Sequence, residues 1–326
     1  MSLFFAIITI LSPLIAALIC LHFCGPKRRT KMGEPPVKEY MLRPAGESSR
    51  RVISALNEKV TEDTLMISAF PTAMAFTYFH QYSLRAGNPG ATWWMFSLLT
   101  FGFVFWRSHI LYRRILELRN RELGYAGEQL VAERLAPVAQ HGCLIFHDCP
   151  ADMHGNIDHI VITPSVVYAI ETKTRRKRPS PDPERATCEV IYDGHCLDFP
   201  HGREDFALDQ TRRQALWLAD LLKKALAVPV EVRAVLALPG WIVRRKGRGD
   251  VAVVNPKELP ALIRDKSAVP SPSEAARRMQ QIAFVLDGRC RDVAFGTNPA
   301  TTEAETLPRP KKIRVTRPRY SLSGRR

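Results

Sequence analysis

The stretch GNIDHIVITPSVVYAIETK, residues 155–173, decides the fold. It predicts two strands, Ile157–Thr163 and Val166–Lys173, joined by a tight turn at Pro164 and Ser165. Both strands are apolar on both faces, which is typical of strands that are covered on both sides of a sheet. We therefore expect this hairpin to form the centre of an α/β core.

The turn sets the register of this hairpin. A loop of two or four residues centred on Pro164 and Ser165 places Asp158 directly opposite Glu171, whereas a three-residue loop would shift the pairing. Side chains alternate between the faces of a strand, so Lys173 lies on the same face as Glu171. Two opposed carboxylates repel each other, and the cost is larger on strands this apolar. The pattern therefore indicates a cation between the two acids.

A divalent metal ion explains this arrangement. Carboxylate oxygens suit Mg²⁺ or Mn²⁺, and Lys173 beside the metal can hold a phosphate oxygen or help activate a water. We expect Asp158 and Glu171 to bind the metal and Lys173 to complete a phosphodiester-cleaving site. The alternative is a buried ion pair between Lys173 and one of the two acids.

A helix predicted from about Asn120 to Leu135 precedes the hairpin, and Pro137 is expected to end it. Gly124 and Gly127 lie in its inward arc, which suggests close backbone packing. Glu128 lies at the edge of that face, where it can serve as an additional metal ligand, directly or through water. The alternative is a flank carboxylate in solvent.

A second helix, from about Glu204 to Leu226, carries an apolar stripe that Gln210 and Gln214 interrupt. Buried amides need hydrogen-bond partners, and we expect Gln210 to find them in the active site. The alternative is that both amides cap neighbouring strands. His159 points to the face opposite Asp158, and we expect it to be a packed core histidine.

Four basic residues follow Lys173 almost at once. We expect this cluster to contact a nucleic-acid backbone without reading sequence, and the alternative is a solvated basic loop. The net charge of +15 favours phosphate polymers or anionic lipid surfaces. The cluster consists of Arg175, Arg176, Lys177 and Arg178.

The other elements complete a modest α/β sandwich, in the order helix, strands, helix, strand. A hairpin is expected around Asp193 and Gly194. The strands are predicted at Cys143–His147, Glu189–Tyr192, His195–Phe199, Val230–Leu238 and Val251–Val254, and further helices at Pro256–Arg264 and Ser273–Val285.

The N-terminal third is far more apolar. Residues Leu3–Cys24 are long enough to cross a bilayer, and a basic cluster follows at Lys27–Lys31. By the positive-inside rule that end is cytoplasmic. We therefore expect a transmembrane span at residues 1–24 and a cytoplasmic basic linker at residues 25–63.

Residues 64–106 hold two further apolar stretches with basic residues on both outer flanks. This pattern predicts a transmembrane helical hairpin whose ends are cytoplasmic, and the alternative is a buried or interfacial hairpin. We expect a multi-pass protein of the inner or plasma membrane, with membrane lipids as partners and the soluble domain in the cytoplasm. The chain has seven cysteines, an odd number, and no CxxC motif. This pattern suits free thiols in a reducing compartment. The basic tail at residues 297–326 is expected to be disordered.

The ordered motifs GYAGE (124–128), GNIDHIV (155–161), IETK (170–173) and DQ (209–210) resemble the nuclease-related domain, NERD. That family is similar to the PD-(D/E)xK nuclease superfamily. The resemblance implies a restriction-endonuclease-like core at 120–240 within a domain at 120–290, with a central mixed sheet flanked by helices. Matched by position, it implies metal ligands at Asp158, Glu171 and Glu128. Lys173 would be the catalytic lysine and Gln210 the helix-borne glutamine.

The family often has a glycine soon after the lysine, and this chain has Thr174 and Arg175 there. The leading hypothesis is a membrane-anchored endonuclease that depends on Mg²⁺ or Mn²⁺ and acts on DNA, without a small-molecule cofactor. The alternative is a non-catalytic module at the membrane that binds nucleic acid or another protein.

Overall fold

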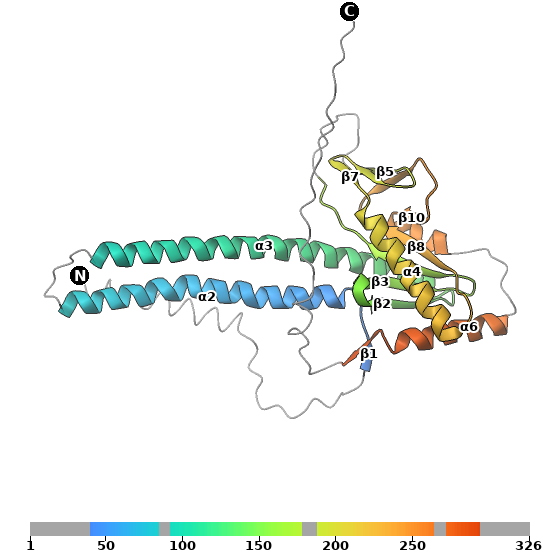
Figure 1. Cartoon of the computed structure of the whole chain (residues 1–326), viewed down its shortest axis with the longest axis horizontal. Helices are drawn as coiled ribbons and strands as arrows, with labels where there is room; N and C mark the ends of the chain where they lie inside the picture. Colours follow the sequence, from blue (N-terminus) through green and yellow to red (C-terminus); the bar gives the residue numbers. More distant parts are fainter. Residues whose placement is uncertain (1–39, 85–91, 178–187, 264–271, 294–326) are drawn as a thin grey trace, which may run out of the picture. The chain divides into compact units, whose positions relative to one another are not determined.

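The computed structural model of the chain describes residues 40–84, 92–177, 188–263 and 272–293 (Figure 1). The predicted span at 1–24 and the predicted tail at 297–326 lie outside these residues. The elements are β1 (Tyr40–Leu42), α2 (Glu47–Leu84), α3 (Thr92–Ala139), β2 (Leu144–Pro150), η1 (Asp152–His154), β3 (Asn156–Ile162), β4 (Val167–Thr172), β5 (Glu189–Tyr192), β6 (Leu197–Phe199), β7 (Gly202–Glu204), α4 (Phe206–Leu226), β8 (Val232–Ala237), β9 (Ile242–Arg245), β10 (Val251–Val254), η2 (Pro256–Glu258), α5 (Leu259–Ile263), α6 (Pro272–Asp287) and β11 (Arg291–Val293).

The main sheet has five strands in the order β10-β8-β4-β3-β2. β10, β8 and β4 run parallel, whereas β4, β3 and β2 pair antiparallel, so the sheet is mixed, as the resemblance implies. β3 and β4 are buried along nearly their whole length, because helices cover both faces.

Two apolar clusters show which helices cover which face. Ile160 and Ile162 pack in one cluster with side chains of α4 and α6, such as Leu218 and Ile282. The intervening Val161 faces the other cluster, which holds side chains from the end of α3 and from α5. The α/β prediction with helices on both sides of the sheet is therefore confirmed.

The hairpin of β3 and β4 has the predicted register. Ile162 pairs with Val167, which leaves a four-residue loop at 163–166. The Thr163 amide donates a 3.0 Å hydrogen bond to the Val166 carbonyl, which closes the loop. Continuing this register places Asp158 opposite Glu171, one position beyond the pair of His159 and Ile170.

A second sheet has four strands in the order β7-β6-β5-β9. Its β5–β6 hairpin confirms the prediction around Gly194, where φ is +101°. The second strand begins at Leu197 instead of His195, because Asp193 Oδ1 accepts hydrogen bonds from the His195 and Cys196 amides. The sequence did not predict β7 or β9, nor the two-stranded ribbon of β1 and β11.

Two long helices precede the sheets, and their lengths differ from the predictions. The helix expected at 120–135 is the end of α3, which continues through Pro137 to Ala139. Pro137 lies in the last turn, so its missing amide removes only one hydrogen bond. α2 begins at Glu47, inside the segment expected to be a linker. Asp63 of α2 is fully buried between Arg107 and Arg114 of α3, at 2.7 and 2.5 Å.

The predicted hairpin at 64–106 is formed by α2 and α3, but its two membrane spans are not supported. None of the helices in the described ranges is long and apolar enough to cross a membrane. The apolar part of α3 is interrupted at Arg107, soon after it begins at Thr92, whereas a span needs about 20 apolar residues.

Candidate active site

Glu171 of β4 is the centre of the candidate site. Its side chain is 2% exposed, and its Oε1 accepts a 2.8 Å hydrogen bond from Gln210 Nε2 and contacts Lys173 Nζ. The contact predicted for Gln210 is therefore present. Oε2 is buried and has no hydrogen-bond partner. A buried carboxylate oxygen without a partner is costly, so this atom is a candidate ligand for a cation.

Asp158 of β3 faces Glu171 across the hairpin. Its Oδ2 accepts a 2.7 Å hydrogen bond from the Thr172 amide, which fixes the carboxylate at the end of β4. Burial raises the pKa of Asp158 well above its ordinary value, and the negative charges of Glu171 and Glu128 raise it further. The predicted repulsion between the opposed acids is present.

Lys173 balances part of this negative charge. Burial by itself would lower the pKa of its ammonium, but Glu171 and Asp158 raise that pKa above the ordinary value. Lys173 is therefore a cation at neutral pH, and it forms an ion pair with Glu171. This contact is the ion pair that the sequence left as the alternative to a metal.

Glu128 of α3 lies near the other acids, and it is not a flank carboxylate in solvent. Burial raises its pKa to about 7, and the charges of Asp148 and Glu171 add to this effect, against a hydrogen bond from Ser49 and the charge of Lys173. Its Oε1 accepts a 2.9 Å hydrogen bond from Ser49 Oγ.

Close packing of α3 on β4 brings Glu128 to this place. A Cβ at Gly127 would lie 2.1 Å from Cγ2 of Thr174, so glycine is needed there. Gly124, which the sequence placed in the same arc, has open space around it.

Asp148 of β2 is an acid of this region for which the sequence predicts no role. It is 1% exposed, has a φ of +49° and lies opposite Asp158 in the β2–β3 register. Its carboxylate accepts hydrogen bonds from the amide and hydroxyl of Ser48 and from Asn156 Nδ2. Only the pairing of β2 with β3 could have revealed it, because no local motif contains it.

His159 is fully buried on the opposite face, as predicted, and its Nδ1 lies 2.8 Å from Nδ1 of His147. Burial lowers the pKa of both imidazoles, and for His159 the neighbouring His147 lowers it further. The pair is therefore neutral at physiological pH and packs inside the core.

Only part of the basic cluster after Lys173 is available for contacts with a ligand. Arg175 forms a 2.9 Å ion pair with Glu204, so its charge is largely compensated. Arg176 is exposed and donates hydrogen bonds to Arg119 O and Asn120 Oδ1, and Lys177 is also exposed. Arg178 lies outside the described residues. Arg176 and Lys177 are thus the better candidates for phosphate contacts.

The acids do not form a complete metal site as they stand. Within the described ranges, no three His, Cys, Asp or Glu side chains lie close enough together to hold a metal ion. One oxygen of Glu171 contacts Lys173 and Gln210, and one oxygen of Glu128 is held by Ser49. Any metal would have to displace or reorient part of these contacts.

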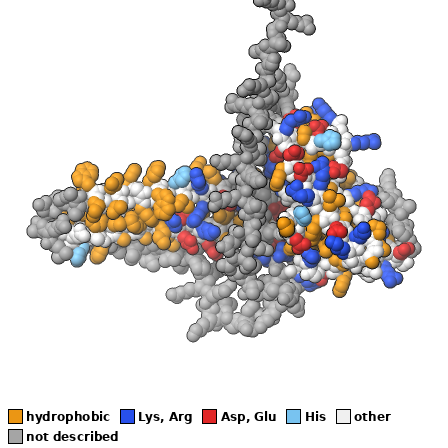
Figure 2. Space-filling model, viewed as in Figure 1, with side chains coloured by type: hydrophobic (Ala, Val, Ile, Leu, Met, Phe, Trp, Pro, Cys, Tyr) orange, Lys and Arg blue, Asp and Glu red, His pale blue; other side chains and the backbone are white. Residues whose placement is uncertain are grey.

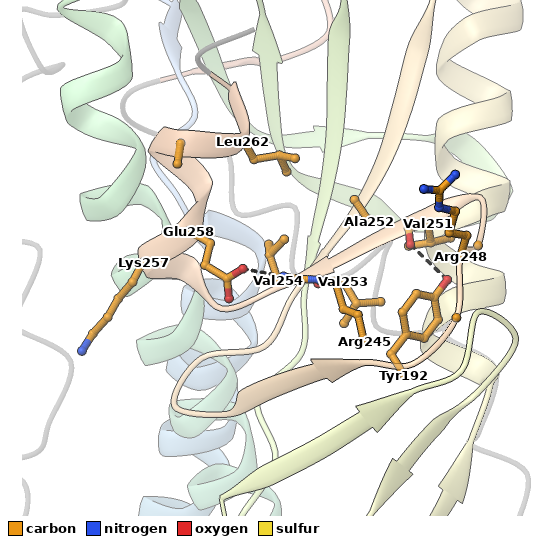
Figure 3. Close-up of a pocket in the computed structure, with 13 residues that line it drawn as sticks. Tyr192, Arg245, Arg248, Val251, Ala252, Val253, Val254, Lys257, Glu258 and Leu262 are labelled. Carbon is orange, nitrogen blue, oxygen red and sulfur yellow. Dashed lines mark hydrogen bonds and ion pairs between the residues drawn. The ribbon is translucent and has the colours of Figure 1, made fainter.

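A surface pocket lies elsewhere, between the loop that follows β9 and the helix α5 (Figure 3). Tyr192 borders it, and its hydroxyl donates to the Val251 carbonyl at 3.0 Å. Arg245, Arg248 and Lys257 give the pocket a basic rim. The candidate acids do not line this pocket, so it is separate from their site.

The chain was compared with curated proteins, solved structures and protein-family models, and only the family models gave a match. No curated protein and no solved structure matches it. One family model does match, and its limits lie within three residues of the predicted core at 120–240. Residues 123–239 match the family model of the nuclease-related domain, NERD.

Proposed function

We propose that this protein is a metal-dependent nuclease that hydrolyses phosphodiester bonds in DNA. The observation that carries the proposal is the buried carboxylate of Glu171, whose Oε2 has no partner, with the carboxylate of Asp158 opposite it. Two opposed acids are stable together when a cation lies between them, and hard oxygen ligands favour Mg²⁺ or Mn²⁺.

The carboxylate donors suit such an ion, which would have to displace or reorient contacts that now engage Glu171 and Glu128. Asp158 and Glu171 would hold it, with Glu128 as an additional ligand. The metal would supply Lewis acidity and lower the pKa of a bound water. Lys173 is a cation beside these acids, so it can hold an oxygen of the scissile phosphate. Gln210 keeps Glu171 oriented through its amide.

The proposed substrate follows from charge. The exposed side chains of Arg176 and Lys177 lie a few residues beyond Lys173, where a phosphate backbone would approach. Such contacts would bind DNA without sequence preference, and their strength would fall as salt concentration rises.

The test is plasmid cleavage by the full chain in Mg²⁺ or Mn²⁺. We expect cleavage that EDTA abolishes and that Asp158→Ala or Lys173→Ala lowers about 100-fold or more. Asp220→Ala, on an exposed part of α4, is the matched control and should cleave like the wild type. No cleavage, or cleavage that survives both site substitutions, would contradict the proposal.

A second candidate function is binding of nucleic acid without cleavage. The ion pair between Lys173 and Glu171 favours it, since Lys173 compensates an acid that a metal would otherwise compensate. This function predicts salt-sensitive DNA binding that neither needs Mg²⁺ nor leads to cleavage.

We also propose that the protein is held at a membrane with the nuclease-related domain in the cytoplasm. The apolar composition of residues 1–24 supports this proposal. The pair of helices also supports it, because exposed aromatic and aliphatic side chains gather along α2 and α3 (Figure 2). Trp94 and Phe101 are among the most exposed of these, at 75% and 72%. An apolar patch of this kind indicates contact with a lipid surface or another apolar partner.

Flotation of the full chain with vesicles of anionic lipid tests this location. Wild-type protein should float, and Trp94→Ser combined with Phe101→Ser should reduce the bound fraction. Phe284→Ser is the control, because Phe284 is at least as exposed but lies on α6. Failure of the wild type to float would contradict membrane attachment.

A further inference from the structure

Residues 43–51, which we call the strap, lie outside the matched domain but contact its candidate site. The strap includes the start of α2, and Figure 1 shows this end of α2 beside β2 and β3. Asp148 fixes it, because its carboxylate accepts hydrogen bonds from the Ser48 amide at 2.9 Å and the Ser48 hydroxyl at 2.6 Å. Gln129 donates to the Ala45 carbonyl, and the Arg43 amide donates to the Cys290 carbonyl at 2.8 Å.

The strap contacts the carboxylate of Glu128. Ser49 Oγ donates to Oε1 at 2.9 Å. Gly46 lies against Oε2, since a Cβ built on Gly46 would be 3.0 Å from that oxygen and 2.7 Å from the ring of Tyr125. Gly46 has a φ of +70° and no side chain, which permits this approach. Glu128 is therefore engaged by a segment about 80 residues earlier in the chain.

This engagement competes with metal binding. The Ser49 hydroxyl already binds Oε1, and a carboxylate held in this way cannot turn toward an ion without losing that hydrogen bond. The strap contacts Glu128 in this structure. In the described part of the chain, Glu128 does not lie close enough to two other acids to hold a metal ion with them.

We propose that the strap is autoinhibitory, and that Ser49 is the positioning residue that withholds Glu128 from the metal centre. The inference rests on the proposed function, because it assumes that Asp158 and Glu171 bind a divalent cation. Release of the Ser49 contact frees Glu128 to complete the ligand set.

The test measures Mn²⁺ binding by the full chain from the electron paramagnetic resonance signal of free Mn²⁺, without reference to cleavage. Ser49→Ala should bind Mn²⁺ about fivefold more tightly than the wild type, as expected from loss of one competing hydrogen bond. Ser49→Thr keeps the hydroxyl and should bind like the wild type. Adding Glu128→Gln to Ser49→Ala should remove the gain.

Two failures are distinguishable. Binding that requires Asp158, but that Ser49→Ala leaves unchanged or weakens, would overturn the strap and leave the metal centre standing. A gain that persists in the Glu128→Gln background would also overturn the role of Ser49. Absence of Mn²⁺ binding from the wild type and from every variant, or binding that survives Asp158→Ala, would overturn the metal centre and the strap together.

Discussion

Gln210 of α4 and Glu171 of β4 are joined by a 2.8 Å hydrogen bond from Nε2 to Oε1. The bond connects two elements that are far apart in sequence, and it leaves Oε2 of Glu171 without a partner. The orientation of the carboxylate therefore depends on Gln210 as well as on Lys173.

Replacing Gln210 tests this dependence. Gln210→Leu keeps the approximate volume but removes the donor, so we expect nuclease activity to fall about 10-fold to 100-fold, as with other partners of metal ligands. Gln214→Leu is the control one turn further along α4, because Gln214 donates to the Asn156 carbonyl and not to Glu171. Equal losses of activity in both variants, after correction for stability, would contradict the assignment.

The raised pKa of Glu128 predicts how the stability of the metal-free protein depends on pH. Its pKa is about 7 in the folded chain and about 4.5 in the unfolded chain. Below about pH 4.5 the carboxyl is protonated in both states. Between that pH and about 7 the unfolded state loses its proton first, so the free energy of unfolding should fall by about 1 to 3 kcal/mol as pH rises.

Thermal melting from pH 5 to 8 without divalent metal measures how stability changes with pH. The raised pKa of Asp158 contributes a change in the same direction. Glu128→Gln should flatten the slope in part, whereas Glu133→Gln, an exposed residue of the same helix, should leave it unchanged. A slope that Glu128→Gln does not alter would show that Glu128 titrates normally.

The buried Asp63 predicts what holds α2 to α3. Asp63→Asn keeps the shape of the side chain but leaves the charges of Arg107 and Arg114 uncompensated. We expect the free energy of unfolding to fall by about 2 to 4 kcal/mol, with faster proteolysis of the helical pair. Glu62→Gln, at the neighbouring exposed position, is the control. An unchanged melting temperature for Asp63→Asn would contradict the role of this ion pair.

The sequence predicted the placement of Asp158, Glu171 and Gln210 because its determinants are local. A four-residue loop between two apolar strands fixes Asp158 opposite Glu171, and the period of α4 points Gln210 inward. By contrast, the bond between Ser49 and Glu128 joins residues 79 positions apart, and no local pattern predicts it.

Asp148 was missed for a related reason. Its carboxylate is held by Ser48 of the strap, and its register depends on the pairing of β2 with β3. The membrane spans at 64–106 were predicted from apolar composition, which does not show that α2 and α3 continue into charged turns. Tertiary contacts decide these features, so local patterns in a single sequence do not predict them.

Anomalous diffraction from crystals of the full chain soaked in Mn²⁺ would locate the ion that Asp158 and Glu171 are proposed to bind. We expect one strong peak beside Asp158 with Oε2 of Glu171 as a ligand, at about 2.1 to 2.3 Å from the carboxylate oxygens. A structure saturated with Mn²⁺ in which Oε2 of Glu171 has no ligand, and in which the ion binds elsewhere or not at all, would contradict this expectation.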